Sequence, residues 1–337
     1  MTVPQPRKKI LGIGPAKGAL AEFEQLCKDF QVHMINRGPR EQAEIEKRCA
    51  EDGPFEAMFL MFANGSYAPM DEDLLAPLWK NGNNVGCFAQ CGTGYDNVEV
   101  KDITQHGCVS FCTLYTCADN QYFTNTPDAV TEATADFTVA MFLVTLRGLT
   151  MASMAASAGH FHQDVKLTQD PRGLTVGILG FGRIAKDFAR KVSPWNVKIQ
   201  YNARTRRSVD EEERYGARYV EKDELFKTSD VIVILTPFTP ETYHMVDRDQ
   251  FRLMKGERDD YNPDADRVDG VYIINSSRGA VMNEVALIEA LESGKVERAA
   301  LDVYEDEPKI NPYFLNNPRV TATPQTGKPE TPVNGPF

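Results

Sequence analysis

The chain has 337 residues, which predicts two domains at about 150 residues each. Hydrophobic residues make up 42% and charged residues 25% of it, a globular mixture that excludes a mainly disordered protein. Acidic residues number 48 against 37 basic ones, and the net charge of −11 argues against nucleic acid or an anionic membrane surface as a partner. A small anionic substrate remains compatible with this balance, because one arginine in a cleft can outweigh the average field.

Three features of the sequence bear on its cellular location. The most apolar stretch, residues 137–146, is far shorter than the roughly 20 residues that span a bilayer, so it predicts a buried helix. The basic N-terminal residues 7–9 are not followed by the apolar run of a secretory signal. The odd number of cysteines, 7, fits reduced thiols. We expect a soluble cytoplasmic protein with no membrane partner.

Five cysteines lie close together in the first half of the chain: Cys87, Cys91, Cys108, Cys112 and Cys117. None of their spacings is the CxxC pair of a zinc site, and Cys87 belongs to an apolar run. We expect small buried hydrophobic side chains here and no metal site.

The first third of the chain alternates short apolar runs with amphipathic stretches. This pattern predicts strands at 10–13, 32–35, 57–62 and 85–89 and helices at 19–30 and 71–79. A second series predicts strands at 174–179, 197–201, 231–235, 271–274 and 299–303 and a helix at 183–192. Such alternation is typical of α/β domains, so we expect two doubly wound parallel sheets in tandem, with residues 125–135 as the crossover.

A glycine-rich turn opens the second series. Residues 176–185 read Val-Gly-Ile-Leu-Gly-Phe-Gly-Arg-Ile-Ala, which places Gly180 and Gly182 between a strand and a helix, with Ala185 at the third small position. The first glycine permits a tight turn, the second lets the backbone approach a pyrophosphate, and the helix N-terminus offers N–H groups to that anion. The turn therefore predicts a dinucleotide site.

A second glycine-rich stretch, near the N-terminus, does not fit this pattern. Gly12 and Gly14 precede Pro15, and the third glycine, Gly18, comes one residue late. We expect this stretch to end a strand rather than to bind phosphate.

The end of the next strand bears on the choice of dinucleotide. An acidic residue about 20 positions after the first glycine would bind an unphosphorylated ribose. Residues 201–207 read Tyr-Asn-Ala-Arg-Thr-Arg-Arg and contain no carboxylate. Arginine forks bind phosphate bidentately, so Asn202, Arg204 and Arg206 predict NADP in preference to NAD. The alternative is a solvated basic turn.

Charged residues follow two later strands. Arg278 ends one in Ile-Ile-Asn-Ser-Ser-Arg-Gly-Ala, and Asp302 ends another in Asp-Val-Tyr-Glu-Asp-Glu-Pro. In doubly wound sheets the carboxyl ends of the strands line the ligand crevice, so both side chains are expected to face a bound nicotinamide.

With these motifs the sequence resembles the D-isomer-specific 2-hydroxyacid dehydrogenase family, which includes phosphoglycerate dehydrogenase and glyoxylate and hydroxypyruvate reductases. The similar segments, in the family's order, are residues 91–97, 125–127, 131–136, 235–237, 276–279 and 302–308. The resemblance implies a flavodoxin-like substrate domain over residues 1–127, to which 313–337 would return as a shortened tail. It also implies a Rossmann NAD(P)-binding domain over 128–312 and a homodimer.

The resemblance assigns roles to individual residues. Arg278 would bind and polarise a 2-keto acid, and Glu307 would raise the pKa of a partner histidine so that it donates a proton. An ordinary buried ion pair is the alternative for these two residues. Asp302 would hold the nicotinamide carboxamide. The other implied contacts with substrate or cofactor are Thr93, Gly94, Thr131, Gly180, Gly182, Arg183, Ile184, Thr236, Ser276 and Ser277.

The family's histidine is replaced. In Val-Thr-Ala-Thr-Pro-Gln-Thr-Gly, residues 320–327, Gln325 occupies its position. An amide can orient a keto oxygen but has no proton to give at neutral pH. His160 and His162 lie in a loop that nothing places near Glu307. Two functions therefore stay open: an NADPH-preferring reductase of small 2-keto acids such as glyoxylate or hydroxypyruvate, and a nucleotide-binding pseudoenzyme with a regulatory role.

Two segments interrupt the expected alternation of strands and helices. Residues 111–123 and 256–269 fall where the family's connections are short, and the chain ends soon after Gln325. A mis-assembled reading of the gene, with retained non-coding stretches, is one hypothesis that accounts for these features together.

Overall fold

The computed structural model describes residues 7–14, 20–35, 41–61, 70–80, 82–91, 94, 98, 100, 106, 109–110, 122–125, 130–161, 168–256 and 270–327. The chain divides into two compact units between Val130 and Thr131. Each unit is an α/β layer structure built on one parallel sheet, which confirms the predicted fold class.

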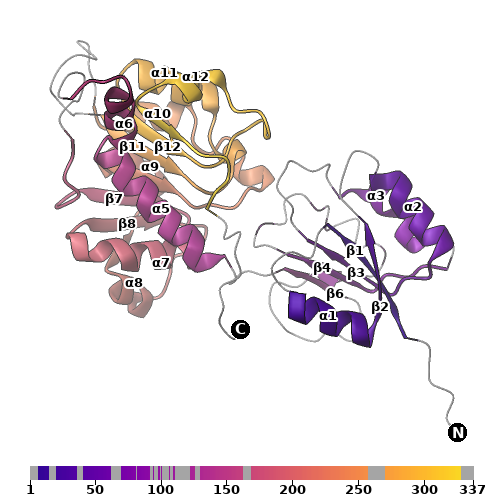
Figure 1. The fold of residues 1–337 in the computed structure, drawn as a ribbon. Coiled ribbons are helices and arrows are strands. Elements are labelled where there is room, and N and C mark those ends of the chain that lie inside the picture. Colours follow the sequence, from indigo (N-terminus) through magenta and orange to yellow (C-terminus); the bar gives the residue numbers. More distant parts are fainter. Residues whose placement is uncertain are drawn as a thin grey trace, which may run out of the picture. The chain divides into compact units, whose positions relative to one another are not determined.

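The first unit has its strands in the order β2-β1-β3-β4-β6-β5 (Figure 1). All its strand pairs are parallel, and the order extends the flavodoxin-like arrangement 2-1-3-4-5. Its elements are β1 (Lys9–Ile13), α1 (Leu20–Asp29), β2 (Gln31–Ile35), α2 (Glu41–Glu51), β3 (Ala57–Leu60), α3 (Glu72–Leu75), β4 (Cys87–Gln90), β5 (Val109–Ser110) and β6 (Tyr122–Asn125).

Local sequence explains where these elements begin and end. Asp71 caps α3, because its side chain accepts a hydrogen bond from the backbone N–H of Leu74 at 3.0 Å. The helix predicted over 71–79 is shorter than expected, since Pro77 lies in a 3-10 turn, Ala76–Trp79, that follows α3. Strand β6 includes the last two residues of the segment 111–123, and residues 111–121 and 257–269 lie outside the described residues.

The second unit has a seven-stranded parallel sheet in the order β13-β12-β11-β10-β7-β8-β9. Its strands are β7 (Thr175–Leu179), β8 (Lys198–Asn202), β9 (Ala217–Tyr219), β10 (Val231–Ile234), β11 (Val271–Asn275), β12 (Val296–Leu301) and β13 (Val320–Ala322). Its helices are α5 (Thr131–Leu146), α6 (Leu149–Ser157), α7 (Arg183–Val192), α8 (Val209–Tyr215), α9 (Lys222–Thr228), α10 (Arg248–Leu253), α11 (Glu284–Glu292) and α12 (Pro312–Asn316).

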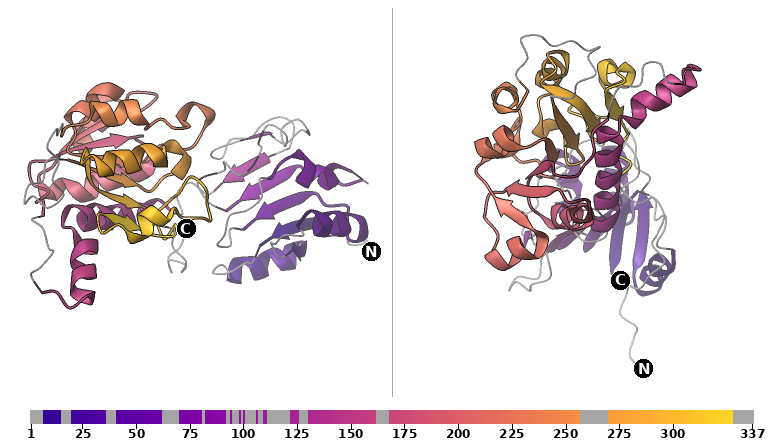
Figure 2. Two further views of the ribbon diagram at one scale, coloured as in Figure 1. Left: turned by 90° about the horizontal axis from the view of Figure 1, so that it is seen from above. Right: turned by 90° about the vertical axis from the view of Figure 1, so that its left-hand side faces the viewer.

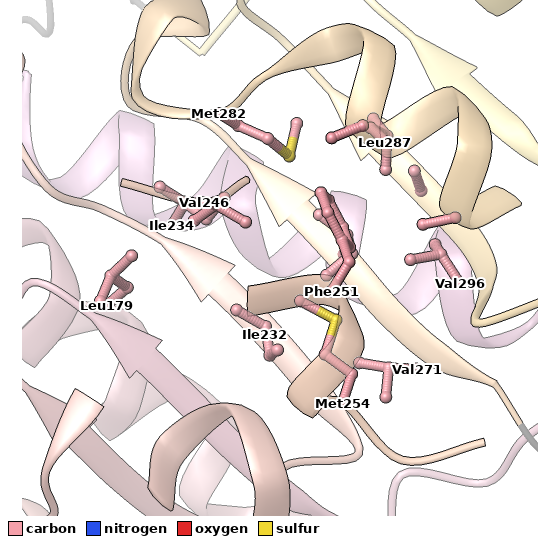
Figure 3. Packing of buried hydrophobic residues seen from close by; sticks show 14 of the residues in the cluster. Leu179, Ile232, Ile234, Val246, Phe251, Met254, Val271, Met282, Leu287 and Val296 are labelled. Atoms are coloured by element: carbon pink, nitrogen blue, oxygen red, sulfur yellow. The ribbon is translucent and has the colours of Figure 1, made fainter. Parts of the chain in front are cut away.

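Helices cover both faces of this sheet (Figure 2), and the strand residues alternate between them. In β10, Ile232 and Ile234 pack with α9, α10 and α11, as Figure 3 shows for the cluster around Phe251. Val231 and Val233 face the other way, toward α5 and α7. Because both faces are buried, the central strands are continuous apolar runs, which is why the sequence revealed them.

Helices α5 and α6 differ in their surroundings. The central part of α5 is buried against the sheet, with Phe142 fully buried, as the apolar run 137–146 predicted. Helix α6 turns from α5 by 66° and projects from the second unit, where Leu149 is 56% and Met154 45% exposed (Figure 2). Among the described residues no single helix is long and apolar enough to cross a membrane; only this bent pair passes such a test, by length and composition.

The described residues after 312 add a strand to the second sheet, and the rest of the predicted tail lies outside the described residues. We expected residues 313–337 to return to the first domain, but the described part, up to residue 327, lies in the second unit. Strand β13 pairs in parallel with β12, so Val320 lies beside Ala299 and Ala322 beside Leu301. A strand of three residues is too short to give a periodic signal, and its pairing with β12 determines its position.

A half-buried cation ties α7 to α5. The ammonium of Lys191, whose side chain is 15% exposed, lies 2.9 Å from Asp187 Oδ2, contacts Asp136 Oδ1 and is 3.9 Å from Glu132 Oε1. Burial acts to raise the pKa of Asp187, but hydrogen bonds from Lys191 and Arg190 outweigh it and hold that pKa below its ordinary value of 3.8. A lowered carboxyl pKa stabilises the fold at neutral pH, and this contribution disappears as pH falls through it.

We therefore predict that Lys191→Met destabilises the protein by about 1–3 kcal/mol at pH 7, because Asp187 then keeps a poorly solvated charge with Arg190 as its remaining partner. The loss shrinks as the pH falls below the ordinary carboxyl value of 3.8 and through the lowered pKa of Asp187, where the carboxyl protonates. Urea unfolding at pH 7 and at a series of lower values down to about pH 2 measures both effects. Arg252→Met is the control, since Arg252 and Asp249 form an ion pair that is 74% and 81% exposed. An equal loss in both variants, or a loss independent of pH, contradicts the prediction.

Candidate functional site

The candidate site lies at the carboxyl edge of the second sheet. Strand β7 is central in the sheet, with β8 on one side and β10 on the other. From β7 the chain continues to β8 and β9 on one side, and it then returns to β10 on the other side of β7. The strand order therefore reverses at β7, and a crevice is expected at its carboxyl end. Doubly wound sheets bind ligands at this topological switch point. The glycine-rich turn and the predicted residues that follow β8, β10, β11 and β12 all lie along this edge (Figure 1).

Gly180 allows the loops after β7 and β10 to meet. Its φ is +90°, in the left-handed region that favours glycine. A Cβ at this position would lie 2.8 Å from the carbonyl oxygen of Leu235 and 2.8 Å from both the backbone nitrogen and Oγ1 of Thr236. The structure thus brings two predicted cofactor residues, Gly180 and Thr236, into direct contact.

Gly182 has the opposite surroundings. It is the N-cap of α7 and supplies no side-chain cap, so the first N–H groups of the helix point into the crevice without a capping oxygen. A Cβ on Gly182 would meet no described atom within 4 Å. Open space directly over an uncapped helix N-terminus fits the pyrophosphate of a dinucleotide. Arg183 and Ile184 begin the helix beside this space, and Arg183 is exposed.

The loop after β8 is fastened to this turn. The backbone N–H of Gly180 donates to the carbonyl of Asn202 at 2.8 Å, and the side chain of Asn202 donates to the carbonyl of Val220 at 2.9 Å. Asn202 therefore fixes the end of the strand next to the glycine turn. Farther along the loop, Arg204 is exposed.

Arg206, which the sequence predicts to contact the coenzyme, pairs with a carboxylate of the protein. Its Nε and Nη2 donate to the two carboxylate oxygens of Glu212, both at 2.9 Å, and its guanidinium carbon lies 5.7 Å from the centre of the Tyr219 ring. The hydrogen bonds to Glu212 raise the pKa of Arg206, and those from Arg206 lower the pKa of Glu212. The charge expected to face a 2′-phosphate is thus balanced by a residue of α8. Sequence reasoning missed Glu212 as the partner of Arg206, because Glu212 lies on a separate helix.

The segment after β11 is organised by Asn275, which is fully buried. Its Oδ1 accepts hydrogen bonds from Ser277 N at 3.1 Å and Ser277 Oγ at 2.9 Å, and its Nδ2 donates to the carbonyl of Arg278 at 3.0 Å. Ser276 Oγ lies 2.8 Å from Thr138 Oγ1 on α5. The Ser-Ser-Arg turn therefore has a fixed shape, and the half-buried Arg278 is placed at the sheet edge.

Gly279 lets this turn lie against the segment after β12. A Cβ there would lie 1.8 Å from the carbonyl carbon of Tyr304 and 2.4 Å from the nitrogen of Glu305, distances that no side chain tolerates. The two signature segments, 276–279 and 302–308, are thus in backbone contact, although the sequence only indicated that each follows a strand.

Asp302 is 3% exposed, and its carboxylate holds the segment that contains Gln325. Oδ1 accepts from Thr323 Oγ1 at 2.7 Å and from the N–H and Oγ1 of Thr326 at 2.8 and 3.2 Å, and Oδ2 accepts from Gly327 N at 2.9 Å. The predicted contact with a carboxamide would have to use the remaining acceptor position on Oδ2. Gln325 itself has φ of +56°, and its N–H donates to the carbonyl of Asp302 at 3.0 Å.

Glu307 lies on the exposed turn after β12. Its Oε1 accepts a hydrogen bond from the N–H of Tyr304 at 3.0 Å, which closes the turn. The predicted role of Glu307 as the partner of a proton donor stays a prediction.

A histidine that sequence reasoning missed lies beside the Arg278 turn. His244 Nε2 lies 2.6 Å from Glu305 Oε1, and the backbone N–H of His244 donates to the carbonyl of Ala280 at 2.9 Å. The ring of Tyr243 stacks on His244 with centroids 3.9 Å apart. His244 is far in sequence from its partner, so neither periodicity nor motif indicated this pair.

Acidic groups surround the pair formed by His244 and Glu305. Glu305 N donates to Glu284 Oε1 at 2.8 Å, and Glu284 N donates in return to Glu305 Oε2 at 3.4 Å. Burial raises the pKa of Glu284, and the charges of Glu305, Asp306 and Glu307 raise it further. The site therefore combines a cationic guanidinium with a strongly acidic rim.

The remaining predicted residues are distributed over both units. Thr131 is the first residue of α5. Gly94 belongs to the first unit, where its carbonyl accepts a hydrogen bond from the buried Gln90 Nε2 at 2.8 Å. Thr93 lies outside the described residues. No cluster of three or more potential metal ligands occurs among the residues that the structure describes.

Comparison with known proteins agrees with this arrangement. Residues 139–327 match the family model described as D-isomer specific 2-hydroxyacid dehydrogenase, NAD binding domain. A Schizosaccharomyces pombe protein classed as a 2-hydroxyacid dehydrogenase is 36% identical over 358 aligned residues, covering 98% of this chain and 97% of the relative. The 4-methyl-2-oxopentanoate reductase A of Aspergillus oryzae is 33% identical over 94% of this chain and 87% of its own length.

A solved structure is similar over both units. The crystal structure of a glyoxylate reductase from Paecilomyes thermophila has a TM-score of 0.81 and 31% sequence identity, and the match covers 96% of this chain and 89% of that one. The crevice, the glycine turn and the matched length together lead to one conclusion: the chain belongs to the D-isomer-specific 2-hydroxyacid dehydrogenase family, and its second unit is the family's NAD-binding domain.

Proposed function

We propose that this protein reduces small 2-keto acids, such as glyoxylate or hydroxypyruvate, to D-2-hydroxy acids, and that it uses NADPH in preference to NADH. The observation that carries the proposal is the open space over Gly182 at the uncapped start of α7, beside the contact between Gly180 and Thr236. Backbone N–H groups there suit a pyrophosphate, and Arg278 at the end of β11 suits the carboxylate of a keto acid.

The proposed chemistry divides between coenzyme and protein. A reduced nicotinamide held at this edge would supply the hydride to the keto carbon, and solvent would have to supply the proton to the keto oxygen, because the amide of Gln325 has none to give. Arg278 binds the substrate carboxylate with its planar guanidinium and polarises the adjacent carbonyl. Ser276, Ser277 and Asp302 line the edge at which the nicotinamide ring would lie. Relatives named for glyoxylate and for 4-methyl-2-oxopentanoate support the 2-keto acid class, and the difference between those two substrates leaves the side chain of the natural one open.

Two further features belong to the proposal. The exposed apolar side chains of α6, Leu149 and Met154, support a homodimer, since such a surface on a projecting helix is stabilised by burial against a second copy. The described cysteines Cys27, Cys49, Cys87 and Cys91 are free thiols, which supports a reducing compartment such as the cytoplasm.

A second candidate function rests on Gln325. An amide at the position of the family's histidine cannot donate a proton at neutral pH, and the carboxylate of Glu307 is used within its own turn. A protein that binds the dinucleotide without turnover, and acts through that bound state, is consistent with both observations.

We predict that Gln325→His raises the rate of coenzyme oxidation with glyoxylate or hydroxypyruvate by about 10²- to 10⁴-fold, because it restores a general acid. Absorbance at 340 nm measures the rate with NADPH and with NADH. Gln325→Asn is the matched control, since it keeps an amide and should gain nothing. If neither wild type nor Gln325→His oxidises a coenzyme that calorimetry shows to be bound, the pseudoenzyme is favoured.

Gly182→Ala should leave folding intact and weaken binding of NADPH and NADH alike by about tenfold or more. The added methyl group meets no protein atom, and a φ of −86° suits alanine, but the methyl group occupies the space meant for the pyrophosphate. Thermal unfolding without coenzyme and titration calorimetry with it separate the two effects. Unchanged affinity would place the coenzyme elsewhere.

Arg204→Ala is expected to weaken NADPH binding severalfold more than NADH binding, since only NADPH carries the 2′-phosphate that a guanidinium would contact. Titration calorimetry gives, for each of the two coenzymes, the ratio of the dissociation constant of the variant to that of the wild type. Equal losses would remove Arg204 from recognition of the 2′-phosphate.

A further inference from the structure

The loop that carries the arginines, residues 203–207, is held against the glycine-rich turn at both ends. At its start, the carbonyl of Asn202 accepts from Gly180 N at 2.8 Å. At its end, Arg207 Nε donates to the carbonyl of Phe181 at 3.1 Å. The positions of the loop's charges relative to the dinucleotide turn are therefore set by the protein itself.

The three arginines of this loop are not equivalent. Arg207 is half-buried and its Nε is used by the Phe181 carbonyl. Arg206 is 59% exposed but forms two parallel hydrogen bonds with Glu212. Arg204 is exposed, and within the described part of the chain it has no carboxylate partner. Arg207 also has no carboxylate partner among the described residues, but it is half-buried and tied to the Phe181 carbonyl, so Arg204 is the exposed guanidinium of the three whose charge no carboxylate balances.

Glu212 is the fixed member of its pair. Its side chain is 11% exposed, and its Oε1 also accepts a hydrogen bond from Tyr201 Oη at 2.8 Å. That hydroxyl accepts from Arg207 N at 2.8 Å, and the Tyr201 ring stacks on Phe181 with centroids 4.2 Å apart. The carboxylate is thereby connected to the glycine turn through packed aromatic rings, and it determines where Arg206 points.

We propose that Glu212 is a specificity-determining residue for the coenzyme: it withholds Arg206 from the ribose 2′ position and leaves Arg204 as the exposed cation offered there. The inference rests on the proposed function in requiring that a dinucleotide binds at the glycine turn. A bidentate pair would have to break before Arg206 could contact a 2′-phosphate, and the Glu212 carboxylate repels that phosphate. Neither effect acts on the neutral 2′-hydroxyl of NADH.

Glu212→Gln tests this directly, because the amide keeps the acceptor for Tyr201 and loses the charge. Titration calorimetry of the full chain is expected to show that the dissociation constant for NADPH falls about fivefold or more, while that for NADH changes less than about twofold. Glu213→Gln removes the same charge from an exposed position of the same helix and should change neither constant more than about twofold. Adding Arg206→Met to Glu212→Gln should remove most of the gain.

The outcomes are distinguishable. Absence of binding of either coenzyme to the wild type contradicts the proposed function, and this inference with it. Two outcomes contradict the inference alone. One is that the ratio of the dissociation constants for NADPH and NADH is the same in wild type and Glu212→Gln. The other is that Glu212→Gln and Glu213→Gln gain equally in affinity for NADPH. If Glu212→Gln does not fold, as thermal unfolding will show, Arg204→Met decides: the inference requires that NADPH then binds no more tightly than NADH, and a retained preference overturns it.

Discussion

The buried carboxylate of Asp302 is the contact on which the carboxyl edge of the second sheet, with its candidate site, depends. It accepts four hydrogen bonds from the segment after β13, and Gly327 in that segment has a carbonyl that accepts in turn from Thr134 Oγ1 on α5 at 2.9 Å. One carboxylate thus joins the end of β12, the turn with Gln325 and the crossover helix. Buried charge is tolerated here because nearly all of its acceptor capacity is used.

Glycine serves this edge in two different ways. Gly180 and Gly279 are required by the protein's own packing, since a side chain at either would collide with backbone of a neighbouring segment. Gly182 is not required by packing at all, because the space beside it is open. A residue that the fold does not need, at the position where a ligand would approach, is better explained by binding than by stability.

The sequence predicted the central strands, the glycine turn and the placement of Arg278 and Asp302, because these depend on local patterns that tertiary contacts do not override. It did not predict that Arg206 pairs with Glu212, that His244 lies against Glu305, or that β13 joins the second sheet. Each of these is a contact between separate elements, and no periodicity in the chain records which side chains meet. The contact of Arg206 with the coenzyme stays a prediction.

Arg204, Arg206 and Glu212 lie on the loop and helix between β8 and the edge strand β9, and the two arginines are exposed. Exchanges of such side chains cost a protein little folding free energy, whereas changes in the core beneath them cost much. On the proposed function, single substitutions at these positions would change which reduced coenzyme the protein uses and would leave the scaffold and the rest of the candidate site untouched.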